Sequence, residues 1–128
     1  MIILLDTSTP ICKLTFIDGD SHYDDQWQAD RTLAKGLLGY LDENLRKFDK
    51  TWSDISSIGV FEGPGSFTGL RIGITVMNTI ADAQNIPIVG GCGDDWQLQV
   101  INKLKNNENE KIVLPFYGSQ AHITTPKK

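Results

Sequence analysis

The most specific stretch of this chain is GPGSFTGLRIG, residues 63–73. It follows Ile58–Phe61, an apolar run that is typical of a strand buried on both faces. Its first three glycines permit backbone angles or close approaches that a side chain would forbid. A hydroxyl side chain in the turn fits the N-cap of a helix that runs to about Gln84. The stretch therefore predicts a buried strand, a tight turn and a helix.

The glycine-rich turn has two interpretations. The free amide groups at a helix N-terminus form a place where an anion can bind. The turn is not a phosphate-binding P-loop, because no Gly-Lys-Ser/Thr follows it. The alternative is a tight crossover turn that holds no ligand.

The flanking sequence predicts further strands and helices. Residues 11–18 alternate apolar and polar side chains, as a half-buried strand does, and Asp18-Gly19-Asp20 is a hairpin signal. Leucines at three- and four-residue spacings predict an amphipathic helix after the hairpin. The expected strands are 2–5, 11–18, 21–28, 58–61, 87–89 and 112–116, and the expected helices are about 30–48, about 68–84, and from 94 or 95 to about 105.

This order of elements predicts an α/β fold. Three antiparallel strands come first, and two crossovers through helices then add parallel strands. The result is a mixed sheet of five to six strands with helices on both faces. By analogy it matches the ribonuclease H-like fold, which also forms one lobe of actin-like ATPases.

Composition limits the classes of function. The chain has 128 residues, which fits a single domain over 1–128, and a net charge of −4 that disfavours tight binding to nucleic acid. The apolar run Ile2–Leu5 is too short for a signal peptide or a membrane span, so we expect a cytoplasmic protein without membrane contact. Cys12 and Cys92 lack metal-ligand spacing, so we expect two reduced thiols and no metal site.

At residues 63–73 the chain resembles the TsaB family, also called YeaZ. Leu5-Asp6-Thr7-Ser8 is similar to the end of the first strand in that family. Residues 86–90 are similar to the strand that follows the signature helix. The resemblance covers about residues 1–92.

The resemblance implies a non-catalytic subunit that acts in tRNA threonylcarbamoyladenosine (tRNA modification) synthesis. Such a subunit binds TsaD and works with TsaE, so this chain is expected not to be an enzyme by itself. No cofactor is expected on it, whereas ATP and a divalent metal are expected on the partner subunits, and tRNA is contacted only through the complex. The chain resembles the first actin-like lobe over 1–128, and we expect it to lack the second lobe of the family.

The predicted helix 68–84 is the expected partner surface. Its apolar residues span roughly 200°, about twice what one core-facing stripe needs. The alternative is a central helix flanked by its own neighbours. We expect a charged residue at Met77 to abolish assembly while the monomer stays folded, and pairing of two copies through this helix is a further possibility. The predicted contact residues are Leu37, Tyr40, Leu70, Arg71, Ile74, Met77 and Ala81, with Arg71 either a charged contact or a solvated side chain.

Two other functions remain open. In nucleotide-using relatives of this fold an Asp at the end of the first strand helps to hold metal and phosphates, which makes Asp6 a weak ligand candidate. Together with Glu62 and either Asp94 or Asp95 it also suggests a metal-dependent, resolvase-like nuclease. The third possibility is a degenerate fragment that only associates with itself. The weak ligand candidates are Asp6, Thr7, Gly63, Gly65 and Ser66.

Overall fold

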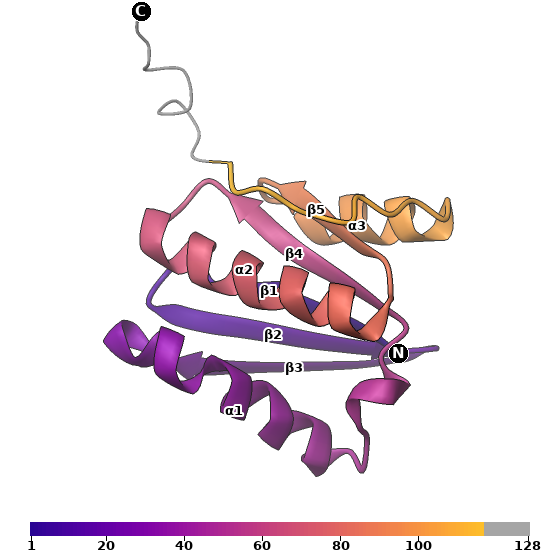
Figure 1. Ribbon diagram of the computed structural model, residues 1–128, viewed down its shortest axis with the longest axis horizontal. Coiled ribbons are helices and arrows are strands. Elements are labelled where there is room, and N and C mark those ends of the chain that lie inside the picture. The colour runs from indigo at the N-terminus through magenta and orange to yellow at the C-terminus, as the bar shows by residue number, and fades with distance from the viewer. Residues whose placement is uncertain (117–128) are drawn as a thin grey trace, which may run out of the picture.

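The structure is a computed structural model, and it describes residues 1–116. Five strands form one mixed sheet in the order β3-β2-β1-β4-β5 (Figure 1). The strands are β1 (Ile2–Asp6), β2 (Ile11–Asp18), β3 (Ser21–Gln28), β4 (Ser57–Gly63) and β5 (Ile88–Cys92). The helices are α1 (Leu33–Lys47), α2 (Phe67–Gln84) and α3 (Trp96–Lys105), and 3-10 turns occupy Asp30–Thr32 and Trp52–Asp54.

The sheet combines an antiparallel half with a parallel half. The strands β3, β2 and β1 pair antiparallel, and β1, β4 and β5 pair parallel. Asp18 pairs with Ser21 across a two-residue turn in which Gly19 has a φ of 61°. A positive φ suits glycine, so the Asp-Gly signal in the sequence is explained.

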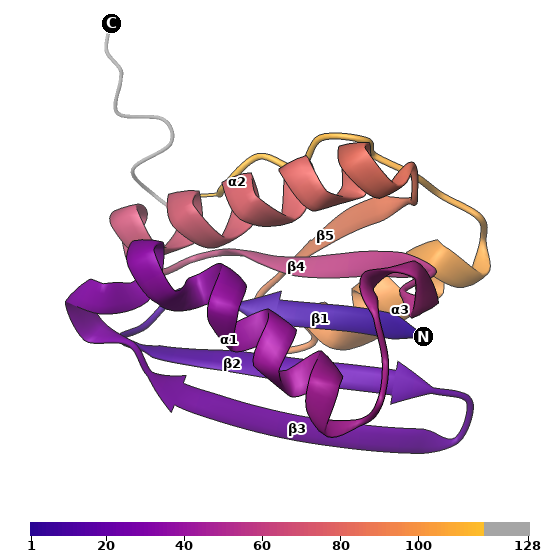
Figure 2. The same ribbon diagram turned by 60° about the horizontal axis from the view of Figure 1, so that its bottom comes forward.

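Helices cover both faces of the sheet. Figure 2 shows α1 and α2 on one face and α3 on the other, and α1 and α2 run in the same direction. On the two-helix face, Leu37, Leu41 and Met77 are fully buried. On the other face α3 packs closely, since a Cβ on Gly59 would overlap Val100. The predicted α/β architecture with a mixed sheet of five to six strands is confirmed.

The predicted strand at 112–116 is wrong. This segment pairs with a side chain instead of a neighbouring strand: Asn78 Nδ2 donates to Val113 O at 2.9 Å, and Val113 N donates to Asn78 Oδ1 at 2.9 Å. Val113 is 1% exposed, whereas Ile112 and Leu114 are exposed. The apolar alternation reflects one buried anchor in an irregular segment. The remaining residues, 117–128, lie outside the part that the structure describes.

Candidate functional site

The end of β1 packs directly against the glycine-rich turn. Ser66 N donates to Ser8 O at 2.8 Å, and Thr7 Oγ1 donates to Gly69 O at 2.7 Å. Thr7 is 3% exposed and Ser8 is 8% exposed. The two segments that carry the family resemblance, 5–8 and 63–73, are therefore one structural unit although about sixty residues separate them.

The glycines of the turn make this contact possible. A Cβ on Gly65 would overlap the Ser8 side chain, and a Cβ on Gly69 would overlap Thr7 O. One turn further along α2, a Cβ on Gly73 would overlap Thr7 Oγ1. Close packing on the end of β1 thus accounts for the glycine spacing, and it supports the tight-turn interpretation over an anion cradle.

The remaining weak ligand candidates also have local structural roles. Asp6 Oδ1 accepts hydrogen bonds from Ser8 N at 2.9 Å and from Ser8 Oγ at 2.7 Å. Ser66 is the N-cap of α2, and its Oγ accepts from Gly69 N at 3.3 Å. Gly63 has a φ of 134°, and a Cβ there would overlap Phe116 O.

The carboxylates of the nuclease hypothesis do not come together. Within residues 1–116 no three His, Cys, Asp or Glu side chains are grouped so that they could hold a metal ion. Glu62 Oε1 accepts a hydrogen bond from Cys92 Sγ at 3.2 Å, and Asp95 Oδ1 accepts from Gln99 Nε2 at 2.6 Å. Each of these carboxylates is used by its own neighbours, so the described part of the chain does not support the predicted nuclease site.

The two cysteines are unsuited to nucleophilic chemistry at neutral pH. Burial, followed by the hydrogen bond to Glu62, raises the pKa of Cys92 to about 11. Burial also raises the pKa of Cys12 to about 12, with smaller contributions from Asp6 and Asp25. The thiolate is the reactive form, so both thiols are held in the unreactive form.

Five of the seven predicted partner contacts lie in the core of this chain, which corrects the sequence-based assignment. The most apolar sectors of α1 and α2 are buried within this chain, so these side chains cannot form an exposed surface. Their exposed fractions are 0% for Leu37, Leu70 and Met77, and 3% for Ile74 and Ala81.

The other two predicted contacts are at least partly exposed. Tyr40 is half-buried on the β3 side of α1, where its hydroxyl donates to Asp25 Oδ2 at 2.6 Å and its ring stacks on Trp27. Burial and the hydrogen bond to Asp25 raise the pKa of Tyr40. Arg71 is exposed on α2, and its guanidinium lies 5.2 Å from the centroid of the Phe67 ring.

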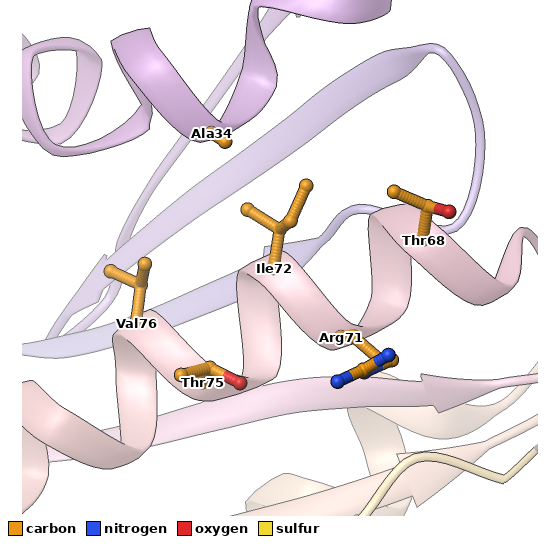
Figure 3. Close-up of a pocket in the computed structure, with 6 residues that line it drawn as sticks. All are labelled: Ala34, Thr68, Arg71, Ile72, Thr75 and Val76. Atoms are coloured by element: carbon orange, nitrogen blue, oxygen red, sulfur yellow. The ribbon is translucent and has the colours of Figure 1, made fainter.

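An apolar groove lies between α1 and α2 and has a volume of about 390 Å³. Ala34 of α1 faces Ile72 of α2, and Val76 follows one turn along the same side of α2 (Figure 3). Ile72 and Val76 are half-buried and Ala34 is exposed. The lining residues are Ala34, Thr68, Arg71, Ile72, Thr75 and Val76.

The sequence argument identified Arg71 in this groove but missed its apolar residues. The apolar arc of α2 was wide enough to include a sector that points away from the sheet. Ile72 and Val76 lie in that sector, four residues apart, and this spacing could have identified them. A second hollow shares Thr68 and Ile72 and extends the groove toward Thr9, Pro10 and Arg31.

None of the helices within residues 1–116 has the length and apolar character that crossing a membrane requires.

Comparison with known proteins relates this fold to one family. A family model described as TsaD, tRNA N6-adenosine threonylcarbamoyltransferase, matches residues 27–106. The tRNA threonylcarbamoyladenosine biosynthesis protein TsaB of Buchnera aphidicola subsp. Baizongia pistaciae is 31% identical over 88 residues, which cover 69% of this chain and 40% of that protein. The tRNA N6-adenosine threonylcarbamoyltransferase of Bacillus subtilis is 44% identical over 62 residues, 48% of this chain and 18% of that protein.

Comparison with a solved structure points to the same family as these sequence relatives. YeaZ from Pseudomonas aeruginosa has a TM-score of 0.67 and 28% sequence identity, with 71% of this chain and 43% of that chain covered. The chain therefore belongs to the TsaD family of actin-like, ribonuclease H-like folds. Within this family, the chain is a member of the TsaB (YeaZ) group. The chain spans about two fifths of the length of the TsaB relatives that it matches.

Proposed function

We propose that this chain takes part in tRNA threonylcarbamoyladenosine biosynthesis as a non-catalytic partner subunit. Its membership of the TsaB group supports the pathway, since its curated relatives carry that name. The use of the signature glycines for packing and the raised pKa values of both thiols argue against a catalytic role for the turn and for the two cysteines. In this proposal ATP and a divalent metal are held by the partner subunits, and tRNA is reached through the complex.

The groove between α1 and α2 is the proposed surface for a TsaD-like partner, and TsaE joins the resulting complex. The single observation that carries this assignment is the apolar lining of the groove at the molecular surface. Half-buried Ile72 and Val76 lose their remaining contact with water when a partner covers them, and burial of apolar area is the main driving force of association. Arg71 at the rim supplies a charge that sets orientation more than affinity.

Substitution in the groove tests the proposal. The chain is co-expressed with the TsaD-like protein of the same genome, and the complex is measured by size-exclusion chromatography with light scattering. The double substitution Ile72→Glu and Val76→Glu is expected to abolish a one-to-one complex. The matched control is Leu98→Glu on α3, because Leu98 is 59% exposed on the opposite face of the sheet. Circular dichroism checks that both variants are folded.

The outcomes separate the alternatives. The proposal is supported if only the groove variant, with Ile72→Glu and Val76→Glu, fails to form the complex and if this variant no longer stimulates tRNA threonylcarbamoylation. A complex that survives in the groove variant means that the partner binds elsewhere. If the wild-type chain forms only a two-copy species that the groove variant disrupts, the groove serves self-association and the partner-subunit function is wrong.

A further inference from the structure

The outward backbone groups at the two edges of the sheet, β5 and β3, differ in whether they have hydrogen-bond partners. The β3 edge lies on the other side of α1 from the groove. At the outer edge of β5, the backbone N–H and C=O groups of alternate residues face away from β4. Ile88 N donates to Asn109 Oδ1 at 3.1 Å, and Ile88 O accepts from Glu110 N at 2.9 Å. Gly90 N donates to Glu110 Oε1 at 2.9 Å.

The remaining outward groups of β5 are bonded as well. Gly90 O accepts from Lys103 Nζ at 2.6 Å. Cys92 N donates to Gln99 Oε1 at 3.1 Å, and Cys92 O accepts from Gln99 Nε2 at 2.8 Å. Side chains of α3 and of the segment after it, together with the backbone N–H of Glu110, thus take the place of a neighbouring strand. They leave no outward backbone group of Ile88, Gly90 or Cys92 for another chain to pair with.

The outer edge of β3 has no such cover. Asp18 and Ser21 flank a two-residue hairpin turn and therefore exchange hydrogen bonds, and the pattern alternates from there along the strands. The bond from Ala29 N to Pro10 O at the far end fits the same alternation. Within residues 1–116, β3 pairs only with β2 and no hydrogen bond reaches the outward groups. The outward residues are His22, Asp24, Gln26 and Gln28.

A hollow of about 590 Å³ lies beside this edge, between β3 and α1. The stacked rings of Trp27 and Tyr40 form one wall, with centroids 5.0 Å apart. Gly36 is needed there, because a Cβ would lie 2.8 Å from the Trp27 ring. Gly39 has no such explanation within the described chain, since a Cβ on it would meet nothing within 4 Å. Gly39 lines the hollow, and a glycine inside a helix lowers the stability of that helix. The open space at Gly39 therefore has a cost in the stability of α1.

The charges around the edge are mainly negative. Asp24 and Asp25 lie in β3 itself, and Glu43 and Asp42 border the hollow. Two positive side chains oppose them. Lys13 is the β2 residue in register with Gln26, and Arg46 lines the hollow, where it forms an exposed i,i+4 ion pair with Asp42 at 2.9 Å. The aromatic wall adds an attraction for a cation that enters the hollow.

We propose that the outer edge of β3 binds an extended, lysine- or arginine-rich peptide segment of a partner protein as a sixth strand. Backbone pairing supplies the alignment, as in other cases of strand addition, and one basic side chain of the segment enters the hollow beside Trp27. A second copy of this chain fits poorly, because antiparallel pairing of two β3 edges about Asp24 or Asp25 places like carboxylates opposite each other. Nucleic acid fits poorly because the carboxylates repel phosphate.

The test uses a fluorescent peptide that alternates lysine with valine over the eight residues of β3, measured by fluorescence anisotropy with the full chain. A peptide in which glutamate replaces lysine is expected to bind at least about tenfold more weakly. Gln26→Pro removes one outward N–H at an edge position that tolerates proline, and it is expected to weaken binding about three- to tenfold. The matched variant Gln26→Ala keeps the N–H and is expected to bind like wild type.

A measurement on the wild-type chain covers the case in which Gln26→Pro does not fold. Amide hydrogen exchange at His22, Asp24, Gln26 and Gln28 is expected to slow when the lysine peptide binds. The proposal is overturned if no peptide binds, if lysine and glutamate peptides bind equally, or if Gln26→Pro and Gln26→Ala behave alike. Protection of the same amides by increasing protein concentration alone also overturns it, because the occupant is then a second copy.

Discussion

Gly73 in α2 is the position where one added methyl group tests the packing of the signature turn most directly. A Cβ there would overlap Thr7 Oγ1 and would lie 2.7 Å from Thr7 Cγ2. Thr7 is 3% exposed, and its Oγ1 donates to Gly69 O at 2.7 Å. Thr7 therefore cannot rotate away from the methyl group without breaking this hydrogen bond.

The expected change in the free energy of unfolding follows from three effects. Overpacking of a filled interior costs about 1–3 kcal/mol. Loss of the hydrogen bond from Thr7 costs about 0.5–1.5 kcal/mol. Alanine is a better helix former than glycine by about 1 kcal/mol, which offsets part of the loss. Gly73→Ala should therefore destabilise the chain by about 2 kcal/mol and lower the urea midpoint by about 1 M.

Gly39→Ala is the matched control, because it makes the same change inside α1 where a Cβ meets nothing within 4 Å. It should stabilise the chain by about 0.5–1 kcal/mol. Thr7→Ala removes the atoms that clash, so adding Gly73→Ala to it should cost less than Gly73→Ala alone, and the coupling energy of this double-mutant cycle measures the contact. If Gly73→Ala raises the urea midpoint as Gly39→Ala does, the packing explanation of the signature is wrong.

Three further predictions concern the core. Met77→Glu, which the sequence argument expected to leave the monomer folded, should instead prevent folding, so that no cooperative transition is seen in urea. Met77 is 0% exposed, and an unpaired buried charge costs several kcal/mol, on the order of the whole stability of a small domain. Asn44→Leu should raise the urea midpoint. It removes Asn44 Oδ1, which is buried without a hydrogen-bond partner in residues 1–116, and this gain of about 1–3 kcal/mol exceeds the loss of about 0.5–1.5 kcal/mol for the hydrogen bond that Asn44 Nδ2 donates to Tyr40 O. The Cys12 pKa is raised from 9.0 to about 12, so the stability contributed by its protonated form is complete below pH 9 and is lost between pH 9 and 12. At pH 10.5 this loss is about 2 kcal/mol, and Cys12→Ala should reduce the alkaline decline in the urea midpoint.

The local rules of the sequence predicted most of the fold. The strand β4, the turn and α2 were predicted from signals that depend only on neighbouring residues. These signals are the glycine spacing, the N-cap hydroxyl and the buried apolar run of β4. The contact of Gly73 with Thr7 was not predictable in this way, because it joins positions 66 residues apart in the sequence. The strand expected at 112–116 failed for a similar reason, since the apolar alternation around Val113 does not reveal that Asn78 of α2 takes the place of a neighbouring strand.

The partner surface shows what a helical wheel lacks. The wheel of α2 gave the width of its apolar arc, but it could not show which part of that arc faces the sheet. Leu70, Ile74 and Met77 are in the core, whereas Ile72 and Val76 remain at the groove beside α1. The cover of β5 was equally invisible, because Gln99, Lys103 and Glu110 are ordinary polar residues until the fold brings them to one edge.

The two proposed surfaces lie on opposite flanks of α1. Ala34 faces the groove with α2, whereas Gly36 and Tyr40 face the hollow beside β3. A partner in the groove and an extended segment on β3 therefore do not compete for the same atoms, and their binding energies should add because separated sites without shared contacts are usually independent. Gln26→Pro should leave complex formation through the groove unchanged, and the groove variant with Ile72→Glu and Val76→Glu should leave peptide binding unchanged. Loss of both interactions in either variant would mean that α1 itself has moved, and the two surfaces would then have to be treated as one.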